Sequence, residues 1–315
     1  MAGNASYDRL ITATMEKYLP TLEDNVFTSK PLSYAITTFG NVVTLDGGTQ
    51  INVRLMYAGT GNQGSYAKGD TFLTDEDEGT TVAVYNWKQY YTVVRLAEID
   101  IAKNSGASAV GRIVEEELQR AEMSASESFD EMFFGDGTGN GSKDFNGLQN
   151  LIDNDNTLGG INASAAGNDF WQSNVTASAG ALTFALLRTP YLTVSEGNDF
   201  PTNGMTTQAL YGALDSLFTS NQRFVDPVMA NQGFEVLLFH GTPVSFDRNA
   251  PAGFFYWLNM KYITLFKLGG NWFRMSDWLE PANQDIRIKK IVSYGELAIS
   301  NRKRQAVLTG VTVPT

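Results

Sequence analysis

A long helical segment constrains the fold of this chain more than any other sequence feature. In residues 108–134, apolar side chains recur at three- and four-residue spacing, which places them on one face of a helix. At a rise of about 1.5 Å per residue this helix would be about 40 Å long, and Gly135 follows it as a stop signal. A helix of that length needs a large partner surface, so we expect it to be the spine of an extended body. Its predicted core residues are Val114, Leu118, Phe129 and Phe133.

The composition argues against several function classes. The chain has 315 residues, one histidine and no cysteine, so it has no disulfide framework, thiolate nucleophile or zinc ribbon. Its net charge of −11 argues against a surface that grips nucleic acid, since phosphate neutralisation needs clustered lysine and arginine. We expect the one compact basic run, Arg302–Arg304, to be solvated or to face another subunit. Neither a signal peptide nor an apolar run of about 20 residues is present, which predicts a soluble protein.

The first third of the chain predicts two arms. Residues 1–40 begin with an amphipathic stretch that Pro20 interrupts, and they have too few neighbours to fold alone. Residues 51–57 and 81–88 alternate with period two, which predicts a hairpin. The glycine-rich polar span between them is too long for a tight turn, so we interpret residues 41–95 as a long two-stranded β-arm. Such an arm is marginal in isolation and needs a partner surface.

The second half predicts another lobe. A helical stripe covers residues 210–218, and residues 235–239 and 244–247 are strand-like on either side of a turn at residues 240–243. Three closing strands, predicted within residues 286–313, alternate well and would complete a sheet near the spine helix. The 30 glycines favour many tight turns and therefore a β-rich fold.

Candidate catalytic and metal-binding motifs are weak. His240 has Asp247 seven residues on, but the chain has no G-x-S-x-G elbow to supply a nucleophilic serine. Asp136–Gly141 resembles the first half of a calcium loop, yet Gly147 stands where a bidentate glutamate is needed, which favours a connector turn. The acidic run Asp75–Glu78 could bind a divalent ion or a basic patch on a neighbour, and a solvated loop tip is the simpler interpretation. We therefore predict no catalytic, cofactor-binding or metal-binding residues.

Several short phrases then occur in a recognisable order. They are Gly135-Asp136-Gly137, Gly147-Leu148-Gln149-Asn150-Leu151, Gly159-Gly160-Ile161, Trp171-Gln172, Gly241-Thr242-Pro243-Val244 and Gly295-Glu296-Leu297. Together with the arms, the long helix and the returning strands, this order resembles the major capsid proteins of tailed phages, which have the α+β Hong Kong 97-type fold. The resemblance implies four regions. They are an N-terminal arm (1–40), an extended β-hairpin loop (41–95), a peripheral domain around the spine helix (96–150 and 284–315) and an axial domain (151–283).

This resemblance implies a structural protein rather than an enzyme. Copies would assemble as hexamers and pentamers into an icosahedral shell that encloses double-stranded DNA without sequence-specific binding, and no membrane would be involved. Portal and scaffolding proteins are implied partners, a decoration protein is a further candidate, and the virion would be assembled in the host cytoplasm. Some family members carry a scaffolding region before the arm; none precedes Met1, which favours a separate scaffolding protein. The candidate subunit contacts are Leu10, Tyr18, Tyr66, Lys68, Phe72 and Leu73.

Lys68 is also a candidate crosslinking lysine by its position in the loop, although an ordinary solvated lysine is the simpler interpretation. Three other functions stay open. A cellular nanocompartment shell would share the fold and enclose a protein cargo, whereas a secreted adhesin would share only the glycine-rich β composition. A divalent-ion-dependent hydrolase would use the acidic loops and turn over its substrate only with metal bound.

Overall fold

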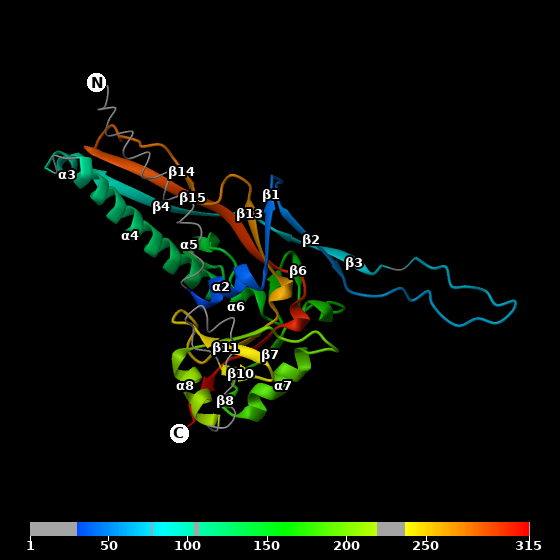
Figure 1. The fold of residues 1–315 in the computed structure, drawn as a ribbon. Coiled ribbons are helices and arrows are strands. Elements are labelled where there is room, and N and C mark those ends of the chain that lie inside the picture. Colours follow the sequence, from blue (N-terminus) through cyan, green and yellow to red (C-terminus); the bar gives the residue numbers. More distant parts are fainter. Residues whose placement is uncertain (1–29, 77, 104–106, 219–236, 315) are drawn as a thin grey trace.

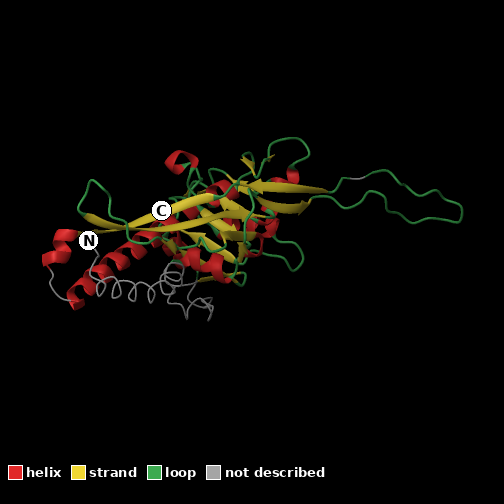
Figure 2. Cartoon of the chain, turned by 90° about the horizontal axis from the view of Figure 1, so that it is seen from above, coloured by secondary structure: helices red, strands yellow, loops and turns green. Residues whose placement is uncertain are grey.

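Two lobes and a projecting arm make up the protein (Figure 1). The structure is a computed structural model that describes residues 30–76, 78–103, 107–218 and 237–314. The upper lobe in Figure 1 contains the longest helix and the longest strands, and the lower lobe contains a second sheet with two helices. Figure 2 shows the arm reaching far beyond both lobes.

The spine helix is α4, Ala107–Phe134, so the helix predicted over residues 108–134 agrees with the structure. It packs along strand β4, Lys88–Ala97, and the short helix α3, Glu98–Lys103, follows β4 directly in the chain. Leu118, Phe129 and Phe133 are all buried on this side of the helix. Val114 lies outside the residues whose side chains the structure describes. The apolar stripe therefore faces the sheet wherever its side chains are described.

Phe129 lies at the centre of an aromatic cluster that joins the helix to the sheet. Its ring centroid is 4.7 Å from that of Tyr90, 5.5 Å from that of Phe145 and 5.6 Å from that of Trp272. The ring centroid of Phe273 is 5.8 Å from that of Phe129. These neighbours come from three separate stretches of sequence, namely β4, the connector after the helix and residues 272–273, so this cluster fixes the helix on a sheet assembled from distant segments.

A five-stranded sheet forms the other layer of this lobe. Its central strand β15 has β4 along one edge, with ten paired positions from Ile286–Ala97 to Gly295–Lys88. Along the other edge it pairs with β13 and β14, and β13 in turn pairs in parallel with β1. The bounds are β1 Asn41–Leu45, β13 Ile263–Leu268, β14 Arg274–Met275 and β15 Ile286–Ile299.

The second lobe contains a six-stranded sheet with the order β10-β11-β9-β12-β16-β7. Helix α7 packs near β16 and β7, and α8 packs near β11, which buries a separate apolar core around Trp257. The bounds are β7 Asn174–Thr176, α7 Phe184–Val194, β9 Asn203–Thr206, α8 Gln208–Leu217, β10 Leu237–Phe239, β11 Thr242–Phe246, β12 Phe255–Leu258 and β16 Ala306–Leu308.

Shorter elements complete the described chain. Helix α2 precedes the first sheet strand, α5 and α6 follow the spine helix, and the remaining pieces are two small strand pairs and three single-turn helices. Their bounds are α2 Pro31–Thr38, α5 Gly139–Ser142, α6 Leu148–Leu151, β5 Thr157–Leu158, β6 Ile161–Asn162, η1 Asp169–Trp171, β8 Gly180–Ala181, η2 Met260–Tyr262, η3 Arg302–Arg304 and β17 Val311–Thr312. In the part of the chain that the structure describes, no helix is both long and apolar enough to cross a bilayer.

The predicted hairpin is present, but its boundaries are narrower than the predicted range 41–95. Strands β2, Ile51–Met56, and β3, Thr80–Tyr85, pair in antiparallel register. The strands on either side of them, β1 and β4, belong to the five-stranded sheet, because their partners are β13 and β15. The part that projects is therefore residues 51–85.

Two other predicted boundaries also differ from the structure. Residues 31–38, placed in an N-terminal arm, form helix α2, and its Leu32, Ala35 and Ile36 are fully buried in the main core. Residues 302–313, predicted to lie in the peripheral domain, instead extend the second lobe, since β16 pairs with β12 and β7 and β17 pairs with β8. Conversely β13 and β14, predicted to lie in the axial domain, belong to the five-stranded sheet. The lobe that contains the six-stranded sheet is called the axial lobe below, as a label only.

Candidate assembly interface

The loop at the tip of the arm exposes large apolar side chains. Tyr66, Phe72 and Leu73 are 70%, 68% and 66% exposed, although the rings of Tyr66 and Phe72 touch each other with centroids 5.0 Å apart. Lys68 is exposed between them. Apolar groups held in solvent on an unsupported hairpin are typical of a surface that is covered by a partner. The structure thus brings four of the six predicted contact residues to one place.

The other two predicted contact residues, Leu10 and Tyr18, lie outside the described residues, as does the predicted helix break at Pro20. The described chain begins at Lys30, just before helix α2.

The acidic run on the arm is exposed where it is described. Asp75, Glu76 and Glu78 face solvent, and Asp77 lies outside the described residues. Two hydrogen bonds from side chains to main-chain carbonyls shape the loop here. Asn62 donates from its side chain to the carbonyl of Asp75, and Tyr57 donates from its hydroxyl to the carbonyl of Glu78 at 2.9 Å. Within the described ranges no group of three or more acidic or histidine side chains is arranged to hold a metal ion.

The phrases at the end of the spine helix form a connector turn. One oxygen of the Asp136 carboxylate accepts from both the amide and the hydroxyl of Thr138, so it is used within the turn. Gly147 packs so closely that a Cβ there would lie 2.3 Å from the carbonyl oxygen of Met132 and 2.4 Å from that of Gly135. Gln149 then donates from its amide to Gly135 and from its side chain to Phe134. This turn closes the helix and returns the chain onto its last turn.

The prediction that the basic run is solvated or faces another subunit is wrong for Arg302, because this side chain is fully buried. It donates from Nε to the carbonyl of Leu151 at 2.9 Å and from Nη2 to Oδ1 of Asn156 at 2.8 Å. Its guanidinium also lies 5.7 Å from the ring centre of Trp171. Burial lowers the pKa of Arg302 to about 10, and Asp153 opposes this shift. The residue fastens the connector after the spine helix to the closing strands of the axial lobe.

Replacing Arg302 should therefore cost stability even though the position belongs to a charged run. Arg302→Ala leaves buried carbonyl oxygens without donors, so we expect a loss of about 2–3 kcal/mol in the free energy of unfolding, measured by urea denaturation. Arg302→Lys should recover only part of this, since an ammonium cannot reproduce the planar fork. Lys303→Ala, at an exposed neighbouring position, is the control and should change stability by less than about 0.5 kcal/mol. Equal stability of the Arg302 and Lys303 variants would contradict this role.

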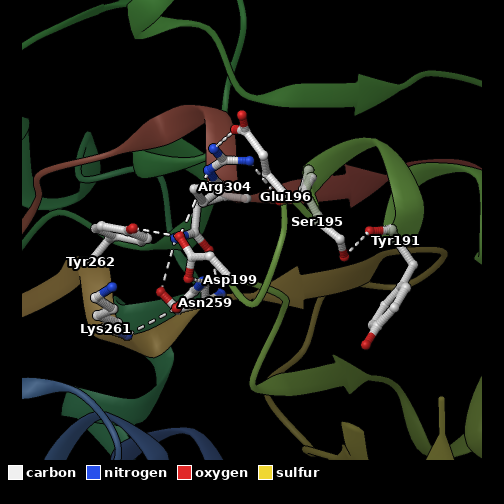
Figure 3. A network of polar contacts seen from close by, with 10 residues as sticks. Tyr191, Ser195, Glu196, Asp199, Asn259, Lys261, Tyr262 and Arg304 are labelled. Carbon is white, nitrogen blue, oxygen red and sulfur yellow. Dashed lines mark hydrogen bonds and ion pairs between the residues drawn. The ribbon is translucent and has the colours of Figure 1, made fainter. Parts of the chain in front are cut away.

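A second polar network connects the loop after helix α7 to the single-turn helices η2 and η3 (Figure 3). Asp199 accepts from Nδ2 of Asn259 at 2.8 Å and from the hydroxyl of Tyr262 at 2.5 Å. Arg304 forms an ion pair with Glu196 and approaches Asp199 at 3.8 Å. Burial and the neighbouring Asp199 carboxylate raise the pKa of Tyr262 to about 12, so this hydroxyl stays protonated and donating at neutral pH. These groups hold loops together and do not present a nucleophile beside a base.

His240 and Asp247 do not form a catalytic pair with a serine. His240 and Gly241 make the two-residue turn between β10 and β11, with φ of 49° and 84°, and the imidazole stacks on the ring of Tyr191 with centroids 5.5 Å apart. Asp247 lies at the end of β11, where it is buried against helices α2 and α4. The hydrogen bonds of Asp247 are therefore structural.

Sequence reasoning did not predict the burial of Asp130, Glu296 and Arg302. One signal was available for Asp130, since it lies between Phe129 and Phe133 on the apolar side of the spine helix. A charged residue in that position needs polar partners from the surface that covers the helix.

Comparison with known proteins identifies the fold through structure alone. No protein-family profile and no curated protein sequence matches the chain. A solved capsid asymmetric unit of cyanophage A-1(L) is similar with a TM-score of 0.67 and 14% identity, over 91% of this chain and 94% of that one. The capsid of a native GTA particle gives a TM-score of 0.59 at 11% identity, over 88% and 90% of the two chains. The holo-SrpI encapsulin complex from Synechococcus elongatus gives 0.55 at 11% identity, over 90% and 88%.

These similarities cover 91% and 88% of this chain. The neighbours are phage capsid proteins and an encapsulin, all of them shell subunits rather than enzymes. The chain thus has the α+β Hong Kong 97-type fold of tailed-phage major capsid proteins.

Proposed function

We propose that this protein is the subunit of an icosahedral shell, and specifically the major capsid protein that encloses the double-stranded DNA of a tailed phage. The observation that carries the proposal is the whole-chain likeness to capsid subunits, with a TM-score of 0.67 to that of a cyanophage. The arm supports it independently, since a hairpin that exposes Tyr66, Phe72 and Leu73 is unfavourable for a lone monomer.

In this proposal the arm lies on a neighbouring subunit and buries its apolar tip there. Contacts of this kind are heterologous, because one patch meets a different patch on the next copy, and they close into rings by rotation. Hexamers and pentamers would then tile the shell. Each contact can be weak, since several contacts per subunit reinforce one another once the lattice has formed. Portal and scaffolding proteins, with a decoration protein as a further candidate, would complete the particle in the host cytoplasm.

The alternative is the shell of a cellular nanocompartment, which an encapsulin neighbour with a TM-score of 0.55 supports. The phage assignment is favoured by the higher TM-score of the cyanophage capsid. The net charge of −11 is compatible with an inner wall that does not adhere to packaged DNA, so that packaging depends on a motor.

Electron microscopy of the full-length chain tests the shell, and the contents of particles from the producing cells test the cargo. We expect closed particles or ordered capsomers from the purified protein. Particles from the producing cells should protect double-stranded DNA from nuclease, because packaged DNA lies behind the shell. A protein that stays monomeric at high concentration would contradict the shell. Particles that contain one enzyme and no protected DNA would instead establish the nanocompartment.

A further inference from the structure

Two buried carboxyl groups meet where the two lobes and helix α2 come together. Asp130, on the spine helix, is 0% exposed, and Asp247, just after β11 of the axial lobe, is 2% exposed. Both side chains accept hydrogen bonds from helix α2 and from Asn249. The core around them is shared by both lobes, since it includes Leu32 of α2 as well as Ala250 and Tyr256 of the axial lobe.

The other hydrogen bonds of this pair connect three separate segments. Ser33 of α2 donates to Oδ1 of Asp130 at 3.0 Å, and Asn249 of the axial lobe donates from Nδ2 to Oδ2 of Asp130 at 3.0 Å. Asp247 accepts from the amide of Asn249 at 3.0 Å and from that of Leu32 at 3.5 Å. Each segment therefore contacts the others through these two carboxyl groups.

The charged groups around the pair do not neutralise it. Lys30, before α2, bonds to Oε2 of Glu127 on the spine helix at 2.6 Å, one turn away from Asp130. Arg248, next to Asp247 in the sequence, is exposed and acts on the same Glu127, whose pKa is lowered mainly by the hydrogen bond from Lys30. Among the described residues, the side chains of Asp130 and Asp247 accept hydrogen bonds from neutral donors only.

A buried carboxyl group beside a second carboxylate ionises only at a cost, so Asp130 keeps its proton at a pH where an exposed aspartate has lost it. Burial, and then the charge of Asp247, raise the pKa of Asp130 from its ordinary 3.8 to about 8. With this proton, Asp130 is a neutral acid beside Asp247 where the spine helix meets the axial lobe. Loss of the proton places two buried negative charges next to each other, and they repel.

We propose that Asp130 and Asp247 form a proton-dependent latch, which holds helix α2 and the axial lobe against the spine helix while Asp130 is protonated and loosens when Asp130 ionises. This latch is a property of the subunit and does not depend on the function proposed above. In a shell it would make the fit between the two lobes, and the anchoring of the N-terminal segment at α2, sensitive to pH.

The sign of the pH dependence follows from proton linkage. The closed junction binds a proton that the open, solvated junction releases near pH 4, so closing is strongest below about pH 4. The stabilisation is lost progressively as the pH rises to about 8, above which the proton is absent in both states. Opening that releases one proton becomes about tenfold more favourable per pH unit within this window.

Amide hydrogen exchange of the full-length protein between pH 5 and pH 8 tests the latch. After correction for intrinsic exchange rates, the opening equilibrium of peptides covering residues 31–38 should rise about tenfold per pH unit in the native protein. In Asp130→Asn the side-chain amide can still donate to Asp247, but it has no carboxyl proton to lose, so the slope should nearly disappear. Peptides from α8, residues 208–217, provide an internal reference away from the junction.

Glu131→Gln is the matched control, since it removes a carboxylate from the adjacent exposed position and should leave the slope unchanged. Asp247→Asn tests the pair from its other side and replaces Asp130→Asn if that variant does not fold. A flat profile in the native protein would overturn the proposal on its own. So would an equal slope in Asp130→Asn and in the native protein.

Discussion

A subunit with a shortened arm should fold but should not form closed shells. The variant replaces residues 58–78 with Asn-Gly, which suits a two-residue hairpin turn. It joins the strands where the structure already brings them together, since the amide of Tyr57 donates to the carbonyl of Gly79 at 2.9 Å and Met56 pairs with Thr80. None of the removed residues belongs to either apolar core. We therefore expect unchanged thermal unfolding of the subunit and loss of closed particles in electron micrographs.

A second variant separates the length of the arm from its chemistry. Changing Tyr66, Phe72 and Leu73 to serine keeps the arm but removes its exposed apolar groups, and it should reduce closed particles nearly as much as the shortening does. The control changes Asp75 and Glu76 to Asn and Gln, which alters charge without altering apolar area. Intact shells from the shortened arm would remove it from assembly. Intact shells from the triple serine variant alone would mean that backbone pairing, rather than apolar contact, holds the arm.

The long helix and the hairpin were predictable because each is recorded in local periodicity. The stripe through Leu118 and Phe129 has a period of about 3.6 whatever lies opposite it, and residues 51–56 alternate because one face of the hairpin is partly buried. The turn after the spine helix was also predictable, because it is rich in glycine. The structure gives the reason for one of these glycines, since no Cβ fits at Gly147.

The domain boundaries depend on pairing between distant strands, which periodicity does not record. Nothing local in residues 306–308 shows that their partner is β12, about 50 residues earlier, rather than the adjacent β15. The same holds for β1, whose parallel partner β13 lies more than 200 residues further on. The predicted domain boundaries therefore kept sequence neighbours in one lobe. In the structure, the chain crosses between the lobes more often than those boundaries allow.

Buried charges were the other unpredictable feature, because their cost is offset by partners from elsewhere in the chain. Arg302 belongs to a run of three basic residues, but the turn η3 points only this one inward, toward carbonyl groups that follow the spine helix. Glu296 is similarly buried, and it accepts from the amides of Asn146 and Leu297 while burial raises its pKa to about 8. The arrangement of these acceptors and donors exists only in the folded state.

A charge placed at the centre of the aromatic cluster should abolish folding. Phe129 is fully buried and packs against Tyr90, Phe145 and Trp272, so Phe129→Asp removes their common contact and leaves a carboxylate without a partner. Truncation to alanine alone costs about 3–5 kcal/mol at such a site, and domains are typically stable by about 5–15 kcal/mol. Adding an unpaired buried charge should exceed the remaining stability. We expect insoluble protein, or a soluble chain without cooperative unfolding by circular dichroism.

Met123→Asp is the control, because it places the same charge at an exposed position on the same helix. Met123 is 74% exposed, so an aspartate there meets water and should shift the free energy of unfolding by less than about 1 kcal/mol. Phe129→Ala lies between the two and should fold with reduced stability, which would show that the aspartate acts through charge as well as lost packing. A normal unfolding curve for Phe129→Asp would mean that the spine helix can leave the sheet without unfolding the lobe. In that case the helix would be an accessory to the core, and the latch at Asp130 would have little rigid structure on which to act.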